Sequence, residues 1–249
     1  MKFIGIIPAR YASTRFPGKP LVDIGGMTMI ERVYRQASQA LERVVVATDD
    51  NRILDAVKAF GGEVVMTSPN HNSGTDRCYE AYINCASDAD VVVNIQGDEP
   101  FIAPSQIDAV KECFTRNEST PIATLVRRFD PALGYDALFN PNTPKVVLDS
   151  DGNALYFSRS VIPYVRGKQH EQWSESATFY THVGLYAYRA DILARITALP
   201  RSPLEIAESL EQLRWLQNGY RIATAVTAEP SVGIDTPQDL DRALAMLNQ

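Results

Sequence analysis

The chain opens with the apolar run Phe3-Ile4-Gly5-Ile6-Ile7, which leads directly into the loop Pro8-Ala9-Arg10-Tyr11-Ala12-Ser13-Thr14-Arg15-Phe16-Pro17-Gly18-Lys19-Pro20. The run has the composition of a buried β-strand. Cations alternate with small residues along the loop, and the small residues let backbone N–H groups approach a ligand. The cations are Arg10, Arg15 and Lys19, and the small residues are Ala9, Ala12, Ser13 and Gly18. The loop is therefore predicted to be an anion site that holds a polyphosphate. A solvated basic loop is the alternative, but such loops rarely interleave cations, small residues and prolines so regularly.

The first strand begins a regular alternation of strands and helices. Apolar runs rich in Val and Ile predict strands at residues 3–7, 43–47, 63–66 and 91–95. Amphipathic stretches between them predict helices at residues 29–40, 52–60 and 75–85. This alternation is typical of a parallel sheet covered on both faces, whose strands are followed by loops along one edge. The opening loop should therefore meet residues 48–50 and 96–98 at that edge.

The second half predicts a mixed sheet with an inserted region for a substrate or for dimer contacts. Strands are expected at residues 145–148, 154–157, 182–188 and 221–225. Ser202-Pro203-Leu204-Glu205 has a Ser cap, Pro at the first helical position and Glu three residues after the cap, which predicts a helix that ends at Gly219. Thr236-Pro237-Gln238-Asp239 predicts the start of a final helix in the same way.

The composition is that of a globular protein, and one basic loop on an acidic chain suggests a small anionic ligand. The 249 residues are 45% hydrophobic and 22% charged, with a net charge of −6. A nucleic-acid partner is not expected, because it requires a broad cationic surface. The chain lacks the pattern of an export signal at its start and has no apolar run of membrane-spanning length, so no membrane insertion is expected. Three cysteines without metal-ligand spacing suit a reducing compartment, and we expect a cytoplasmic protein.

Two carboxylates that follow apolar runs are candidate metal ligands. Asp98 comes after a predicted strand, with Gly97 allowing a sharp turn, and Asp235 ends the run at residues 231–234 just before a helix. Mg²⁺ on a polyphosphate usually takes one or two protein carboxylates. Two such carboxylates could hold a metal between a nucleotide phosphate and an acceptor oxygen, as nucleotidyl transfer needs. Each acid taken alone could instead be a turn or cap residue.

Other segments are candidates for binding a base or a second substrate. Ser73-Gly74-Thr75-Asp76-Arg77 opens a predicted helix and could read a base edge, although an ordinary capped helix also explains it. Arg159 follows a strand, and His182 shares a strand face with Tyr186, which suits a hydroxylated ligand. His182 alone would more often be a structural histidine. The helix begun at Ser202 is expected to place four side chains on one face, for which exposure to solvent is the default explanation: Glu208, Glu211, Gln212 and Trp215.

Several functional classes lack their motifs. Lys19 is followed by Pro20, and no Gly lies five residues before Gly18, so the loop is not a P-loop. No Gly-x-Gly-x-x-Gly follows a strand, which disfavours a dinucleotide oxidoreductase. Covalent hydrolase and zinc chemistry lack support, because the chain has no Ser-His-Asp order, no paired His-x-x-x-His and no Cys-x-x-Cys.

Seven motifs follow one another along nearly the whole chain, at residues 7–21, 46–49, 73–77, 94–100, 154–159, 210–214 and 235–237. In this order they closely resemble the 3-deoxy-manno-octulosonate cytidylyltransferase family, the CMP-Kdo synthetases of lipopolysaccharide biosynthesis. The resemblance implies an α/β nucleotide-diphospho-sugar transferase (Rossmann-like) fold with a mostly parallel mixed sheet flanked by helices. It also implies transfer of CMP from CTP to the anomeric 2-hydroxyl of 3-deoxy-D-manno-octulosonate (Kdo), with Mg²⁺, in a homodimer.

The resemblance further implies roles for individual residues. The catalytic residues would be Arg10, Lys19, Asp98 and Asp235, the last two as metal ligands. CTP would contact Ala9, Arg10, Ser13, Arg15, Lys19, Ser73, Gly74, Arg77 and Gln96. Kdo would contact Arg159, through its carboxylate, and His182, Tyr186, Glu211 and Gln212. The implied organisation is one domain over residues 1–249, with a nucleotide-binding part at 1–130, a sugar-binding and dimerisation part at 131–230, and a helix at 237–247 that returns to the main body.

The chain departs from the family pattern mainly between Arg166 and Tyr180 and at Pro144, which lie at the rim of the implied sugar site. A related acid, such as an 8-amino analogue of Kdo, could therefore be the preferred acceptor. A CMP-sialate synthetase is an alternative of the same class. A non-catalytic nucleotide-binding regulator is an alternative of another class, which the presence of both Asp98 and Asp235 disfavours.

Overall fold

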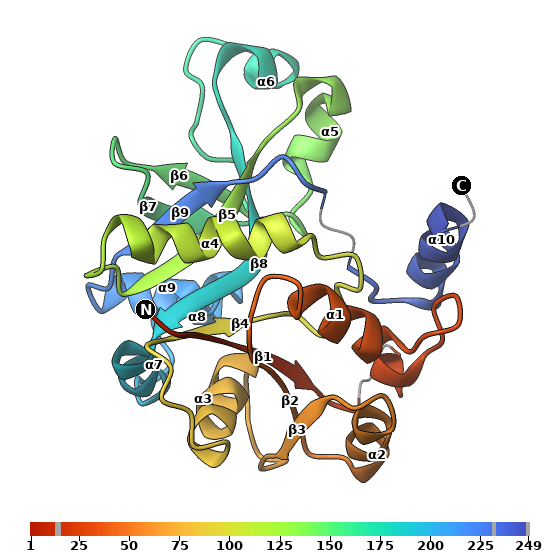
Figure 1. Ribbon diagram of the computed structural model, residues 1–249. Coiled ribbons are helices and arrows are strands. Elements are labelled where there is room, and N and C mark those ends of the chain that lie inside the picture. Colours follow the sequence, from red (N-terminus) through yellow and green to blue (C-terminus); the bar gives the residue numbers. More distant parts are fainter. Residues whose placement is uncertain (13–15, 231–232, 248–249) are drawn as a thin grey trace. The chain divides into compact units, whose positions relative to one another are not determined.

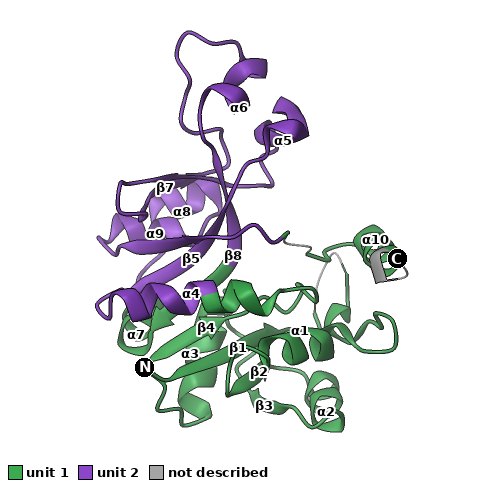
Figure 2. Ribbon diagram, turned by 45° about the horizontal axis from the view of Figure 1, so that its top comes forward, with its two compact units in different colours: residues 1–108, 185–197, 230–249 green, residues 109–184, 198–229 purple. Residues whose placement is uncertain are grey.

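The computed structural model describes residues 1–12, 16–230 and 233–247, and the chain divides into two compact units (Figure 2). Unit 1 comprises residues 1–108, 185–197 and 230–249, and unit 2 comprises residues 109–184 and 198–229. The elements of unit 1 are β1 (Phe3–Ala9), the 3-10 helix η1 (Lys19–Leu21), α1 (Met29–Ala37), β2 (Val44–Thr48), α2 (Asn51–Ala59), β3 (Glu63–Met66), α3 (Gly74–Asn84), β4 (Val91–Asn94), α7 (Ala190–Thr197) and α10 (Pro237–Leu247).

The elements of unit 2 are β5 (Ile122–Arg128), η2 (Pro131–Leu133), α5 (Gly134–Phe139), β6 (Lys145–Leu148), β7 (Ala154–Ser158), η3 (His170–Gln172), α6 (Trp173–Ser176), α8 (Pro203–Glu208), α9 (Gln212–Gln217) and β9 (Ile222–Val226). Helix α4 (Pro104–Arg116) and strand β8 (Tyr180–Arg189) contribute residues to both units.

Unit 1 is built on four parallel strands in the order β3-β2-β1-β4, which confirms the predicted parallel sheet (Figure 1). Gly5 in β1 pairs with Val44 of β2 on one side and Val93 of β4 on the other. All five residues of β2 are buried. Because successive residues of a strand face opposite sides of a sheet, both faces of β2 are covered. The C-terminal half of β8 runs antiparallel to β4, with Tyr186 opposite Asn94.

Polar side chains set the starts of the helices in unit 1. The Thr28 hydroxyl accepts a hydrogen bond from the Glu31 backbone N–H at 3.3 Å, and α1 begins at the next residue. Ser73 caps α3 in the same way, accepting from the Asp76 N–H at 3.1 Å. The three helices predicted in this region are present as α1, α2 and α3, with somewhat different ends.

Unit 2 contains the mixed sheet expected for the second half. Strand β5 lies between the parallel strand β9 and strand β8. Strands β6 and β7 are antiparallel, with a register shift between Val147 and Leu148, and β6 also pairs with β8. Neither β5 nor α4 is among the elements that the sequence patterns predict.

The prediction of one long helix from Ser202 to Gly219 is wrong. The capping box at its start is present, since Ser202 and Glu205 bond to each other's backbone N–H groups. However, α8 ends at Glu208 because Ser209 takes the left-handed conformation, with φ 50°. The chain then starts again as α9, and Gly219, with φ 81°, follows the end of that second helix. The single predicted face that joined Glu208 to residues of α9 therefore does not exist.

Candidate functional site

Lys19 joins the two carboxylates that the sequence singles out. Its ammonium donates to Asp98 Oδ2 at 2.8 Å and to Asp235 Oδ1 at 3.1 Å, all within unit 1. The side chain of Lys19 is only 14% exposed, whereas those of Asp98 and Asp235 are 32% and 46% exposed. Lys19 begins η1 directly after Gly18, whose φ of 71° is left-handed. A cation therefore already lies between two carboxylates at the end of the parallel sheet.

The backbone fixes where Asp235 lies. The Ile234 N–H donates to the Asp98 carbonyl at 2.9 Å, and Ile234 is buried in an apolar cluster with Ile24 and Met29. The Asp239 carboxylate then accepts from the Asp235 N–H at 3.1 Å at the start of α10. The sequence predicts that Asp235 follows the end of a strand, but residues 233–235 are not part of a strand, so this prediction is wrong. Residues 231–232 of the predicted run lie outside the described residues.

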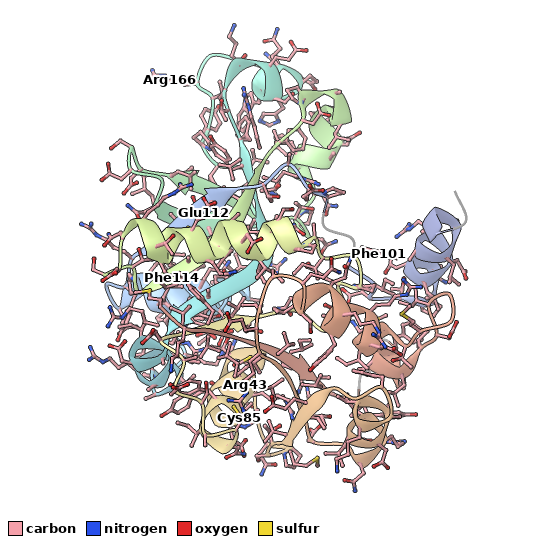
Figure 3. The ribbon with its side chains drawn as sticks, in the orientation of Figure 1. Arg43, Cys85, Phe101, Glu112, Phe114 and Arg166 are labelled. Atoms are coloured by element: carbon pink, nitrogen blue, oxygen red, sulfur yellow. The ribbon has the colours of Figure 1, made fainter. Side chains whose placement is uncertain are left out.

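The segment after Asp98 is anchored in the same cluster. Phe101, labelled in Figure 3, packs against the cluster formed by Ile24, Met29, Ile234 and Ala243. The Asp239 carboxylate accepts from the Thr236 hydroxyl and backbone, and these bonds lower the pKa of Asp239. The segments that carry Asp98 and Asp235 are therefore held by packing and by a helix cap rather than by the carboxylates themselves.

Gly97 lets the segment of Asp98 approach the opening loop. A Cβ atom at Gly97 would lie 2.9 Å from the Pro8 carbonyl oxygen, which is closer than van der Waals contact allows. The close backbone approach, and not a turn with positive φ, explains why glycine is needed here. The predicted meeting of residues 96–98 with the opening loop is confirmed.

Gly97→Ala should lower the free energy of unfolding by about 1–3 kcal/mol, because the added methyl group forces two backbone segments apart. Urea unfolding followed by circular dichroism measures the change. Gly74→Ala is the matched control, since its Cβ would lie 3.4 Å from Pro8 Cγ, an ordinary contact. Equal unfolding midpoints for the two variants would contradict the close-approach explanation.

The described part of the opening loop folds around Tyr11. The Gly18 N–H donates to the Tyr11 carbonyl at 3.0 Å, which closes the loop. The guanidinium of Arg52, itself bonded to Asp50, lies 3.2 Å from the centre of the Tyr11 ring. Ala9 is buried at the end of β1, and Arg10 is exposed directly after it. Ser13 and Arg15 lie outside the described residues.

The residues predicted around the base have different surroundings. Ser73 is occupied as a helix cap, and Gly74 packs beside Pro8. Gln96 is half-buried after β4. Arg77 is 1% exposed, and its guanidinium donates to Asp49 Oδ2 at 3.0 Å and to Thr67 Oγ1 at 2.6 Å. In this structure Arg77 therefore ties the ends of β2 and β3 together, and its expected contact with the nucleotide stays a prediction.

Glu80 is a residue of this region that the sequence motifs do not single out. Its carboxylate accepts from the Ser68 N–H at 2.8 Å and is paired with His71 Nε2. These contacts hold residues 68–71, which precede Ser73, against α3. A glutamate on an amphipathic helix has the signature of a solvent-facing residue, so only the folded loop reveals the role of Glu80.

Arg159 lies in a dense polar cluster of unit 2. Its guanidinium donates to the carbonyls of Glu208 at 2.6 Å, Pro141 at 3.0 Å and Ser209 at 3.3 Å. The Glu208 carboxylate accepts in return from the Arg159 N–H and the Ser158 hydroxyl. Arg159 thus satisfies carbonyls that are left without helical partners where α8 ends.

Lys145 is a buried cation next to this cluster. Its side chain is fully buried, and Nζ donates to the carbonyls of Asn140 at 2.9 Å and Thr143 at 2.8 Å. Burial, followed by repulsion from Arg159, lowers the pKa of Lys145. The family motifs leave Lys145 without a role, and the sequence pattern alone could not have placed it inside.

His182 and Tyr186 both lie in β8, as predicted, and alternation places them on one face of the strand. His182 Nε2 lies 3.1 Å from Thr124 Oγ1, and its ring meets Phe157 edge-on at 5.2 Å. Desolvation of the ring lowers the pKa of His182 to about 4, so the imidazole is neutral at pH 7. Tyr186 is buried in unit 1 and stacks on Tyr188 at 5.9 Å.

The lowered pKa of His182 predicts a pH dependence of stability. Between pH 6.5 and about 4 the unfolded chain binds a proton at His182 that the folded chain does not. The free energy of unfolding should therefore fall as the pH falls through this window, by up to about 1.4 kcal/mol per pH unit. His182→Gln should remove this part of the slope in urea unfolding, whereas His170→Gln, at an exposed position, should not. If His182→Gln leaves the slope unchanged, the pH dependence of stability in this window does not come from His182.

Glu211 and Gln212 lie at the start of α9. The Glu211 side chain is 26% exposed, and its Oε1 accepts from Arg214 at 2.6 Å. Gln212 is 4% exposed, and within the described part of the chain its Nε2 has no hydrogen-bond partner. A buried amide of this kind has unused capacity to donate to a ligand.

The pair Asp98 and Asp235 fits a hard divalent cation. Both offer carboxylate oxygens, and both already contact one ammonium group. Among the described residues no group of three or more His, Cys, Asp or Glu side chains could hold a metal. Two carboxylates are what Mg²⁺ needs when phosphate oxygens and water complete its shell.

This site and the comparison with known families together define the class of the protein. The chain matches the family model described as Cytidylyltransferase over residues 4–222, and it belongs to that family. It is 62% identical over 248 residues to the 3-deoxy-manno-octulosonate cytidylyltransferase of Parabacteroides distasonis, covering 99% of this chain and 98% of the relative. It is also 62% identical over 249 residues to the protein of that name from Phocaeicola vulgatus, covering 100% and 98%.

A solved structure agrees with these relatives. It is described as CMP:2-keto-3-deoxy-manno-octonic acid synthetase complexed with CTP, and it matches with a TM-score of 0.92 and 43% sequence identity. The match covers 100% of this chain and 99% of the other. The expected nucleotide-diphospho-sugar transferase fold is therefore confirmed. Within the described residues no helix combines the length and hydrophobicity needed to span a membrane.

Proposed function

We propose that the protein transfers CMP from CTP to the anomeric 2-hydroxyl of Kdo and releases pyrophosphate. The observation that carries this proposal is the convergence of Lys19, Asp98 and Asp235 at the end of the parallel sheet. The relatives named 3-deoxy-manno-octulosonate cytidylyltransferase and the CTP-complexed synthetase support the choice of nucleotide and acceptor.

In the proposed reaction a Kdo oxygen forms a bond to the α-phosphorus of CTP. The bond from that phosphorus to the bridging oxygen breaks, and pyrophosphate leaves. The hydroxyl proton passes to solvent or to a phosphate oxygen. Arg10 and Lys19 are proposed to stabilise the negative charge on the triphosphate, and Ala9, Ser13 and Arg15 are proposed as further CTP contacts. Ser73, Gly74 and Gln96 are proposed to surround the cytidine.

Asp98 and Asp235 are the residues that would hold Mg²⁺. The ion, when bound, neutralises phosphate charge and lowers the pKa of the acceptor hydroxyl. Lys19 has two proposed roles at this place. Without nucleotide, its ammonium balances both carboxylates at 2.8 Å and 3.1 Å. With CTP bound, it donates to phosphate oxygens and leaves the carboxylates to the metal.

Most of the proposed acceptor contacts belong to unit 2. The bonds from Arg159 to three carbonyls fix its guanidinium plane, and an arginine with five N–H donors retains capacity for a carboxylate. His182, neutral at pH 7, and Tyr186 of unit 1 would meet hydroxyl groups. Glu211 and the buried amide of Gln212 complete the proposed set.

An acceptor screen tests this proposal. Pyrophosphate release from CTP and Mg²⁺ is measured with Kdo, 8-amino-Kdo and sialic acid in parallel. Release with Kdo is expected, and a faster reaction with 8-amino-Kdo would identify that analogue as the preferred acceptor. Release with sialic acid alone would identify a sialate synthetase instead. Tight CTP binding without release in any arm would favour a non-catalytic regulator.

We also propose a cytoplasmic homodimer that supplies CMP-Kdo for lipopolysaccharide biosynthesis. Unit 2 carries exposed large apolar side chains that support contact with a second subunit: Leu133, Tyr135, Leu155, Tyr164, Ile206 and Val226. Sedimentation velocity should give a species of twice the 27.6 kDa chain mass. A monomer at micromolar concentration would contradict the homodimer.

A further inference from the structure

Arg214 is a buried arginine with three partners in unit 2. Its side chain is 7% exposed, Nη2 donates to Glu211 Oε1 at 2.6 Å, and Nη1 donates to the Leu199 carbonyl at 3.0 Å. Its Nε lies 3.4 Å from Glu205 Oε2, an ion-pair contact, and makes no hydrogen bond within the described residues. Glu205 is equally buried, at 8% exposed, and also forms the capping box at the start of α8. A buried guanidinium with partners on several sides is held in one orientation.

The carboxylate of Glu211 takes its orientation from this arginine. Glu211 lies in the short connection between α8 and α9, just after the left-handed Ser209. A partly exposed glutamate in such a connection would ordinarily sample several rotamers. The bond from Arg214, three residues later, selects one of them and leaves the side chain 26% exposed to a ligand.

We infer that Arg214 is a positioning residue for the acceptor sugar, which acts by holding the Glu211 carboxylate toward the hydroxyl groups of Kdo. The inference rests on the proposed function. A carboxylate that is already ordered in the free protein loses little conformational entropy when the ligand binds, so the affinity is higher. Because the network lies within unit 2 and the Lys19 site within unit 1, Arg214 should affect acceptor binding and not CTP binding.

The test compares steady-state constants of Arg214→Met with those of the wild-type protein. The KM for Kdo should rise about tenfold, the effect of losing one charge-assisted hydrogen bond, while the KM for CTP stays within about twofold. Arg214→Lys, which retains the charge without the planar fork, should recover part of the loss. Arg201→Met is the matched control. Arg201 also pairs with Glu205, at 3.4 Å, but is 62% exposed and should leave both constants unchanged.

Two further variants separate positioning from folding. In a Glu211→Gln background, Arg214→Met should add little to the KM for Kdo, because its effect passes through Glu211. The double variant Glu205→Gln with Arg214→Met also removes the buried negative charge that Arg214→Met alone would leave with only the Ser202 N–H and the exposed Arg201 as partners among the described residues, so it keeps the fold testable. It should show the same tenfold rise.

Three outcomes would overturn the inference. They are an equal rise in the KM for CTP, an undiminished effect in the Glu211→Gln background, or an unchanged KM for Kdo in a folded variant. If instead the wild-type protein releases no pyrophosphate with Kdo, the proposed function itself fails, and the inference fails with it. The wild-type control thus distinguishes the two failures.

Discussion

Asp98→Asn is expected to lower kcat for pyrophosphate release by about 10²-fold or more. The substitution keeps the shape of the side chain but removes the charge that faces Lys19 at 2.8 Å. In the proposed reaction Asp98 would be one of the two carboxylates that hold Mg²⁺, and loss of its charge would act mainly on the transition state. Asp235→Asn should have a similar effect, since Asp235 contacts the same ammonium at 3.1 Å.

The Asp98→Asn substitution should lower kcat without lowering the amount of folded protein. The Lys19–Asp98 pair is partly exposed, with side chains 14% and 32% accessible, and such pairs contribute about 0–1 kcal/mol to stability. The melting temperature should therefore change little. Asp55→Asn, an exposed aspartate on α2, is the control and should leave kcat unchanged. Near-normal turnover in Asp98→Asn with CTP, Kdo and Mg²⁺ would contradict the metal assignment.

Lys19→Met is expected to change metal affinity and turnover in opposite directions. In the nucleotide-free protein the Lys19 ammonium competes with a divalent cation for Asp98 and Asp235. Removing it should tighten Mn²⁺ binding to the free protein about tenfold, as measured by electron paramagnetic resonance of free Mn²⁺. Removing it should also lower kcat about 10²-fold, because the triphosphate loses a cation.

In the proposed exchange, Lys19 leaves Asp98 and Asp235 for phosphate oxygens when CTP binds. Tighter Mn²⁺ binding together with lower kcat distinguishes this exchange from a simple loss of charge. Lys58→Met, at an exposed position on α2, removes the same charge from unit 1 and should change neither quantity. The wild-type protein should bind Mn²⁺ more tightly once CTP is present, since Lys19 then has phosphate partners. Unchanged or weaker Mn²⁺ binding to free Lys19→Met would contradict the proposed exchange.

Much of unit 1 could be predicted because local signals and tertiary demands agree there. Strands β1, β2 and β4 are short, largely buried apolar runs in a parallel sheet, and such strands carry a strong pattern. The ends of parallel strands lie at one edge, so Asp98 could be predicted to meet the opening loop. The contact of Lys19 with Asp235, 216 positions later, depends on the position of the final helix, which periodicity alone does not supply.

Unit 2 shows where sequence reasoning failed. The pattern from Ser202 onward is helical throughout, yet α8 ends at the left-handed Ser209, and Arg159 bonds to the carbonyls at that end. Lys145 is satisfied inside by carbonyls of the loop just before β6. The burial of Arg77 depends on a hydroxyl and a carboxylate that lie 10 and 28 positions away in the chain. Long-range hydrogen bonds of this kind leave no periodic trace in the chain.

The most direct test of the proposed function is ³¹P NMR of CTP incubated with Kdo, Mg²⁺ and the wild-type protein. The proposal predicts equal amounts of pyrophosphate and of a CMP phosphodiester of Kdo, formed only when all components are present. CTP that is bound but unchanged, or that is hydrolysed to CMP at the same rate without Kdo, would contradict it.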